Sequence, residues 1–320
     1  MKIPGLSALL FPFLVFLGGC CFGPSAPTTK LAYEAGFSSE SVIFSQYVFG
    51  LAFMIVLSAI FFAVSVIRKK PLRPAHHSAK DIILLIVVGI SIALVSTCYL
   101  FSMQTISASL AVILLFQYTW MSILAEAVIK RRLPDPITII SVVILIGASL
   151  LAIGVGSIAL SSLNPVGVTF GLLSAVFYAL YIQLIGRLNK GLKPVFRSLI
   201  MLSIAVIFLS IIFTPFYLNP QYIAETVIGG SLWPYALVIG SLGCALPNFL
   251  FAIASPKVPA QLTTILSASE LPASIICAVI IISEAVTFLQ WIGVILLFFG
   301  IALPTLYNYI NTRNKAHAQT

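Results

Sequence analysis

The stretch KVPAQLTTILSASELPASIICAVIII, residues Lys257–Ile282, decides the fold of this chain. It is long and apolar enough to cross a bilayer as one helix, since a span needs about 20 apolar residues. Four polar side chains follow one another through its middle at spacings of 4, 3 and 4: Thr263, Ser267, Glu270 and Ser274. Residues at these spacings share one face of a helix. The stretch therefore predicts a transmembrane helix with one polar face.

The acid in this span is its most informative residue. A carboxylate at membrane depth costs roughly 3 kcal/mol on insertion scales, so spans keep one mainly for transport, proton relay or a buried pair. We therefore expect Glu270 to belong to a functional site. The alternative is a helix–helix contact in which Glu270 is neutral and hydrogen-bonded.

Composition places the whole chain in the same class. Of its 320 residues, 60% are hydrophobic and only 8% are charged, whereas soluble domains carry about 25% charged residues. No soluble fold of this length could bury so much apolar surface. The expected class is an all-α integral membrane protein.

Ten segments have the length and hydropathy of transmembrane helices, and short connections between them leave no room for a soluble domain. They are Leu6–Pro24, Val42–Ile67, Ile82–Phe101, Ile106–Ile129, Ile137–Val155, Val166–Gly186, Leu199–Tyr217, Leu232–Ile253, Val258–Ile282 and Phe288–Tyr309. The first segment could instead be a signal peptide cleaved before Cys20. Its internal prolines, Pro4 and Pro12, favour a retained span.

The positions of the basic residues predict the orientation. If the N-terminus, the even-numbered connections and the C-terminus face the cytoplasm, that side holds 16 of the 17 Lys and Arg residues, and only Lys30 lies outside. Such a bias follows the positive-inside rule. It predicts a multi-pass plasma-membrane protein with both termini cytoplasmic. It also explains the net charge of +9 without nucleic acid, because the basic run Arg68–His77 can contact anionic lipid head groups.

The two halves of the chain resemble each other weakly. An offset of 153 places Ile106–Leu151 on Pro259–Pro304, with sparse identities. Five spans per half is an odd number, so the second half enters the membrane from the opposite side, as in many secondary transporters. We expect one five-helix repeat over residues 1–155, an external linker over 156–163, the inverted repeat over 164–310 and a cytoplasmic tail over 311–320.

The same offset places Glu270 on Gln117, in the middle of its own span. Polar groups at equal depth on symmetry-related helices are typical of a substrate site at the bilayer midplane. Alternatively, Gln117 hydrogen-bonds a neighbouring helix, a contact worth about 1 kcal/mol in membranes. Five further side chains are candidates to line the site, although packing is the alternative for each: Gln46, Tyr47, Tyr118, Tyr178 and Asn248.

Glu126 is the second acid inside a predicted span. It lies near the cytoplasmic end, four residues before Lys130. That spacing favours an ion pair on the helix surface. The alternative is a gate on the cytoplasmic side.

Residues for enzymatic chemistry are scarce in the predicted spans. The three histidines, His76, His77 and His317, lie in cytoplasmic segments, so no membrane histidine is available for a metal or a Ser–His pair. Neither aspartate lies inside a span. The sequence also has no phosphate-binding Gly-x-x-x-x-Gly-Lys-Ser/Thr loop. We expect no enzyme, no cofactor and no metal.

The last two spans resemble the EamA-type branch of the drug/metabolite transporter superfamily. Glu284 follows Glu270 at the spacing of the two glutamates in the family pattern, and then come Gln290-Trp291-Ile292-Gly293 and the closing Gly300. The chain departs from that pattern in three places: Pro272 follows Glu270 one position late, Arg131 replaces the equivalent of Glu284, and Phe22-Gly23 stands for Trp-Gly. The resemblance implies a transporter, and family analogy favours export, while the substrate stays open.

We therefore expect a secondary transporter that exports a small organic metabolite or drug by alternating access. Glu270 is the candidate for exchanging a proton with the solute, because burial disfavours its charged form. An exchanger or facilitator without proton coupling, such as a nucleotide-sugar-type carrier, is the alternative within transport. A membrane scaffold protein that moves nothing is the alternative outside it.

Overall fold

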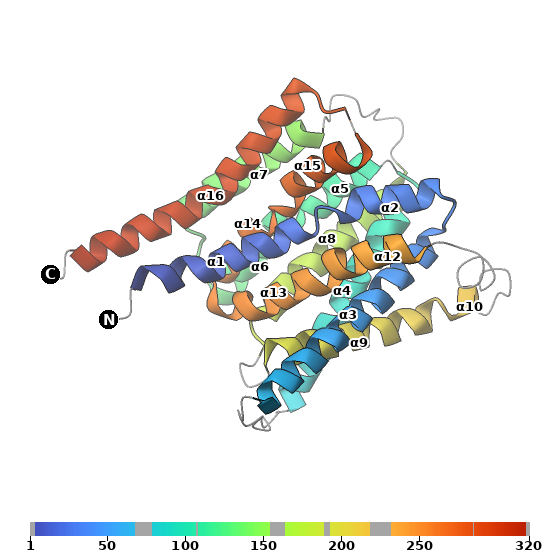
Figure 1. Cartoon of the computed structure of the whole chain (residues 1–320). Coiled ribbons are helices and arrows are strands. Elements are labelled where there is room, and N and C mark those ends of the chain that lie inside the picture. Colours follow the sequence, from blue (N-terminus) through green and yellow to red (C-terminus); the bar gives the residue numbers. More distant parts are fainter. Residues whose placement is uncertain are drawn as a thin grey trace.

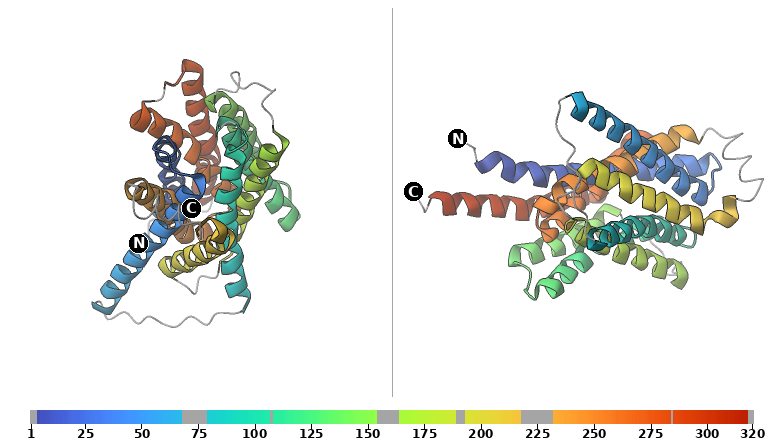
Figure 2. Two further views of the ribbon diagram at one scale, coloured as in Figure 1. Left: turned by 90° about the vertical axis from the view of Figure 1, so that its right-hand side faces the viewer. Right: turned by 90° about the horizontal axis from the view of Figure 1, so that it is seen from below.

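The computed structural model describes residues 4–67, 79–106, 108–153, 164–188, 193–217, 232–283 and 285–317. All regular secondary structure in these ranges is helical. The helices lie side by side in one elongated bundle, and both ends of the chain lie at the same end of it (Figures 1 and 2). The expected all-α class is confirmed.

The first half contains α1 Pro4–Cys21, α2 Ser25–Glu34, α3 Ser39–Ile67, α4 Ala79–Met103, α5 Ala108–Phe116, α6 Tyr118–Lys130 and α7 Pro136–Ile153. The second half contains α8 Pro165–Ile185, α9 Pro194–Ile212, α10 Thr214–Tyr217, α12 Trp233–Gly240, the π-helical turn η4 Ser241–Ala245, α13 Leu246–Ala254, the 3-10 turn η5 Ser255–Lys257, α14 Ala260–Ser267, α15 Glu270–Ile282 and α16 Phe288–His317. Each predicted segment coincides with one of these helices or with two consecutive ones.

Eight helical segments of the described chain are long and apolar enough to cross a membrane. Two shorter apolar helices, Pro136–Ala152 and Phe288–Pro304, accompany them. The chain is therefore a multi-pass membrane protein, while ten crossings and their inversion stay predictions. Helix α16 continues to His317, so the predicted tail boundary at 311 falls inside a helix. The predicted linker 156–163 and residues 318–320 lie outside the described residues.

The predicted span Val258–Ile282 is not one continuous helix but two, α14 and α15. Pro272 lacks the N–H that would bond to the carbonyl of Ala268 in an α-helix. The N–H of Leu271 donates to that carbonyl instead, at 3.2 Å, which tightens the chain into a turn. Glu270 is the first residue of the helix that follows.

The span predicted over Ile106–Ile129 is broken in the same way, into α5 and α6. Here the side-chain Nε2 of Gln117 donates to the carbonyl of Ile113 at 3.0 Å. The backbone N–H of Gln117 then donates to Leu114, three residues back, at 3.2 Å. The amide side chain thus replaces one backbone bond of the helix, and the next helix begins at Tyr118.

The bounds of the two broken spans fix the repeat offset. Gln117 and Ser269, which precede α6 and α15, have the same φ of −60° and ψ of −16°. Arg131 and Ser283, which end these helices, are both left-handed, with φ of 51° and 52°. Both pairs give an offset of 152, so the predicted offset of 153 is one position too long. At 152, the counterpart of Glu270 is Tyr118.

Helix α1 and the turn that follows it approach the second break closely, because each carries a glycine there. A Cβ at Gly19 would collide with the hydroxyl of Ser269, and one at Gly23 would lie 2.9 Å from the backbone of Ala273. The Ser269 hydroxyl donates to the carbonyl of Phe16 at 2.7 Å. The N-terminal helix is therefore packed against the segment that carries Glu270.

Candidate functional site

Glu270 is held at the start of α15 by a tyrosine from another helix. The hydroxyl of Tyr178, on α8, donates to Oε2 of Glu270 at 3.1 Å. The Tyr178 side chain is 3% exposed, whereas Glu270 is only partly buried. The carboxylate therefore has one hydrogen-bond donor within the described chain and unused acceptor capacity.

Tyr118, the counterpart of Glu270, completes this group from the first half of the chain. Its ring centroid lies 4.3 Å from that of Tyr178, and its hydroxyl lies 3.2 Å from Oγ of Ser267. Ser267 uses its own proton on the carbonyl of Thr264, at 2.8 Å, so Tyr118 is the donor to Ser267. Both helix breaks thus meet at one place, through side chains of α6, α8, α14 and α15.

Two other predicted site residues, Tyr47 and Asn248, are engaged in contacts between helices. The hydroxyl of Tyr181 donates to Oδ1 of Asn248 at 2.6 Å, and Nδ2 of Asn248 donates to the carbonyl of Cys244 at 2.7 Å. The hydroxyl of Tyr47 donates to the carbonyl of Ile92 at 2.7 Å. These bonds tie α3 to α4 and α8 to α13.

Gln46 contacts the place where the helix of the eighth predicted span changes register. In an α-helix the carbonyl of Gly243 would bond to the N–H of residue 247, which is proline and has none. Nε2 of Gln46 donates to this carbonyl at 3.1 Å. Gly243 lies in the π-helical turn η4, Ser241–Ala245, a feature often found at functional sites.

Among the described residues, the side chains of the remaining predicted binding residues make no hydrogen bond to the Glu270 carboxylate. Oε1 of Gln117 accepts from Nε1 of Trp120 at 2.7 Å, on the exposed side of the break. The Thr263 hydroxyl is buried without a partner among the described residues. Ser274 is partly buried on α15. A role for these three in substrate binding stays a prediction.

Comparison with known proteins identifies the second half of the chain. The profile of the EamA-like transporter family matches residues 165–306. Over these residues the chain is similar to the EamA-like transporter family. The apolar helices and this match together support a membrane transporter in the general sense.

The overall fold of the chain recurs in solved structures, of which 29 chains match. One of them, titled only as the crystal structure of a protein, superposes with a TM-score of 0.69 at 15% sequence identity. The match covers 95% of this chain and 98% of that one. At this identity the likeness concerns the fold alone. No curated protein sequence matches the chain.

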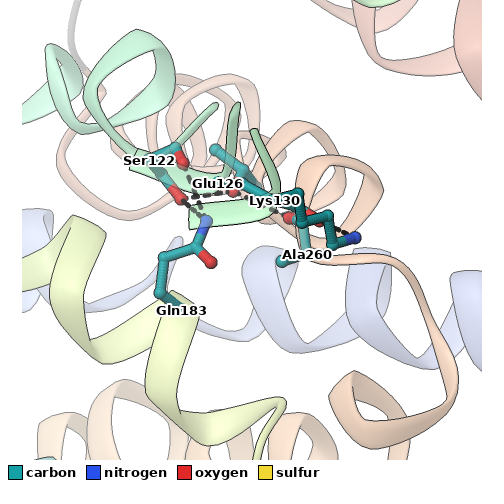
Figure 3. Close-up of polar contacts among 6 residues, drawn as sticks. Ser122, Glu126, Lys130, Gln183 and Ala260 are labelled. Carbon is teal, nitrogen blue, oxygen red and sulfur yellow. Dashed lines mark hydrogen bonds and ion pairs between the residues drawn. The ribbon is translucent and has the colours of Figure 1, made fainter. Parts of the chain in front are cut away.

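A second polar cluster joins the EamA-like segment to α6 of the first half. Glu126 pairs with Lys130 as predicted from their spacing, with side chains 2% and 58% exposed. One turn earlier, Ser122 contacts Gln183 of α8 (Figure 3). Its hydroxyl also lies within hydrogen-bonding distance of Thr264 of α14. The sequence analysis missed these three residues, although Ser122 lies four positions before Glu126 and Gln183 is a glutamine inside a predicted span.

Proposed function

We propose that the protein is a secondary transporter that exports a small organic solute across the plasma membrane by alternating access. In this proposal all ten apolar segments span the membrane as two inverted repeats, residues 1–155 and 164–310. Residues 156–163 link the repeats outside, and both termini, including 311–320, lie in the cytoplasm. The helix bounds that match at an offset of 152 and the termini at one end of the bundle support this arrangement.

The observation that carries the proposal is the position of Glu270. It begins the helix after one break, while Tyr118 begins the helix after the equivalent break, and Tyr178 contacts both. Broken helices at the interface between repeats place polar groups and free backbone ends at membrane depth, where transporters bind their substrates. We assign the solute site to Glu270, Tyr118, Tyr178 and Ser267.

The remaining candidates have supporting roles in this proposal. Thr263, Ser274 and Gln117 extend the polar face on either side of the breaks, while Gln46, Tyr47 and Asn248 hold the helices around it. Glu126 and Lys130 form an ion pair at the cytoplasmic end of α6. The lipid bilayer is the surrounding partner.

Proton exchange at Glu270 supplies the driving force in this proposal. A carboxylate with one donor can accept a proton from the outer side when solute leaves, and release it inward before the next solute binds. A proton gradient directed inward would then drive solute outward. Desolvation disfavours a charged carboxylate without a partner, so the site favours occupancy by either the proton or the solute, which is the condition for exchange.

The test uses the purified protein in liposomes loaded with a metabolite panel under an imposed pH gradient. We expect solute flux that depends on the gradient, and Glu270→Gln should abolish this dependence. Glu34→Gln, at the exposed end of α2, is the matched control and should leave it intact. Saturable counterflow unaffected by pH or by Glu270→Gln would instead indicate an uncoupled exchanger, and no flux of any solute would indicate a scaffold.

A further inference from the structure

The two ends of the bundle are not equally closed. At the offset of 152, α6 and α14 correspond to α15 and α5. Helix α6 packs directly against α14, whereas α15 and α5 make no comparable contact. The counterparts differ in burial as well, since α6 buries Ser122 and Glu126 while the equivalent Ser274 and Ala278 on α15 are only half-buried.

Hydrogen bonds between the halves hold the closed end together. Oγ of Ser122 lies 2.8 Å from Oγ1 of Thr264. Nε2 of Gln183 donates to the carbonyl of Ser122 at 2.7 Å and to its hydroxyl at 3.1 Å (Figure 3). Ser122 and Thr264 are 0% exposed and Gln183 is 4% exposed. We name Ser122, Gln183 and Thr264 the polar clamp.

The polar clamp has no equivalent at the other end of the bundle. The same offset places Ser274, Val112 and Leu31 opposite Ser122, Thr264 and Gln183. Two of these three counterparts are apolar, so they cannot form the same hydrogen bonds. The repeat therefore carries a clamp that favours closure at one end only.

Two buried oxygens next to the polar clamp destabilise the closed state. Oε2 of Glu126 and Oε1 of Gln183 are fully buried without a hydrogen-bond partner among the described residues. The amide oxygen of Gln183 can only accept hydrogen bonds, and so can the carboxylate oxygen of Glu126 when that group is charged. Burying such acceptors without a donor is unfavourable. Opening this end would hydrate both, which lowers the barrier to opening.

We propose that the polar clamp is the cytoplasmic gate of the transporter and that the structure is the state in which this gate is closed. The inference rests on the alternating-access function proposed above. Gln183 is a positioning residue in this gate, because it holds Ser122 against α14 without contacting the solute site. Each transport cycle must break the Ser122–Thr264 and Gln183–Ser122 contacts and let water reach Glu126.

Accessibility of a buried cysteine measures the gate without any solute. Thr263→Cys is nearly isosteric, and the native hydroxyl is 1% exposed and unpaired within the described chain. It is introduced into a full-length variant whose five native cysteines are replaced by alanine. Membrane-impermeant maleimide is then added to the cytoplasmic or to the external side, and the labelling rate is measured.

We expect Ser122→Ala and Gln183→Leu each to raise the cytoplasmic labelling rate about tenfold. The reason is that losing an interhelical hydrogen bond in a membrane shifts the equilibrium between the closed and the open gate by up to roughly that factor. Ser149→Ala is the matched control, since within the described chain this buried hydroxyl bonds only in its own helix, to Ile146 at 2.8 Å, and the substitution should leave the labelling rate unchanged. Thr264→Ser keeps the hydroxyl and should retain the parent rate.

Unchanged labelling in Ser122→Ala and Gln183→Leu, in variants that still transport, would overturn the clamp while leaving the proposed function intact. A rise from the external side would also overturn it. Conversely, clamp-dependent labelling in a protein that moves no solute under any condition would remove the transport function but keep the gate as a conformational device.

Discussion

The carbonyl of Gly243 offers a sharp test of how this bundle tolerates a proline within a helix. Gln46→Leu would remove the donor to this carbonyl, which Pro247 already deprives of its usual backbone partner. An unsatisfied buried group costs about 1–3 kcal/mol, and single interhelical bonds in membranes measure about 0.6–1.7 kcal/mol. From these two ranges we expect Gln46→Leu to lower the free energy of unfolding by about 1–2 kcal/mol.

The second step replaces the proline as well. Pro247→Ala restores an N–H that can bond to Gly243 in an α-helical register. In this background Gln46→Leu should cost less than about 0.5 kcal/mol, because the carbonyl no longer depends on the glutamine. The non-additivity of the double-mutant cycle, about 1 kcal/mol, is the quantity to be measured.

The free energy of unfolding is measured for the parent, the two single variants and the double variant by equilibrium unfolding in mixed detergent micelles, with helical circular dichroism as the signal. Gln104→Leu, at an exposed position beyond α4, is the control for the change from glutamine to leucine and should be nearly neutral. Equal costs of Gln46→Leu with proline and with alanine at position 247 would refute the reasoning. The bond from Gln46 would then not compensate for the proline.

Two further predictions concern the site itself. Tyr178→Phe removes the donor to Glu270 but keeps the ring stack. Solute flux should therefore fall roughly tenfold. Tyr307→Phe, which changes an exposed side chain, is the control and should have no effect in the same flux assay. Gly23→Val forces a Cβ to 2.9 Å from the backbone of Ala273, so α1 must move. The midpoint of thermal unfolding should therefore fall by several degrees. An unchanged midpoint would contradict the close packing.

The positions of the helices could be predicted from hydropathy because membrane spans need long apolar runs. Segment Val42–Ile67 lies within α3, Ser39–Ile67, for example. The breaks could not be predicted, because a helix interrupted for one or two residues keeps the same apolar composition on both sides. Pro272 was visible in the sequence as a possible interruption, but the turn that Leu271 makes before it and the hydrogen bond from the Gln117 side chain appear only in the structure.

The repeat offset shows a second limit of sequence reasoning. Over residues 106–151 an offset of 152 gives 11 identical pairs and an offset of 153 gives six, so a full count of identities already favours 152, although chance matches of isoleucine, leucine and alanine make the six pairs at 153 look like a repeat. The helix bounds and the two left-handed caps, Arg131 and Ser283, distinguish the two offsets because a cap occupies one residue only. The one-residue slip paired Glu270 with Gln117 instead of Tyr118, which rotates the predicted partner by about 100° around its helix.

The hydrogen-bond inventory divides the predicted site residues into two groups with different expected phenotypes. Tyr47 and Asn248 are almost fully buried, and their polar atoms bond to neighbouring helices, so replacing them changes the cost of keeping the bundle together. Glu270 is only partly buried and has one donor in the described chain, so its remaining acceptor sites are available to a ligand or a proton. Substitutions in the first group should therefore alter stability and flux in proportion, whereas Glu270→Gln should alter flux at nearly constant stability.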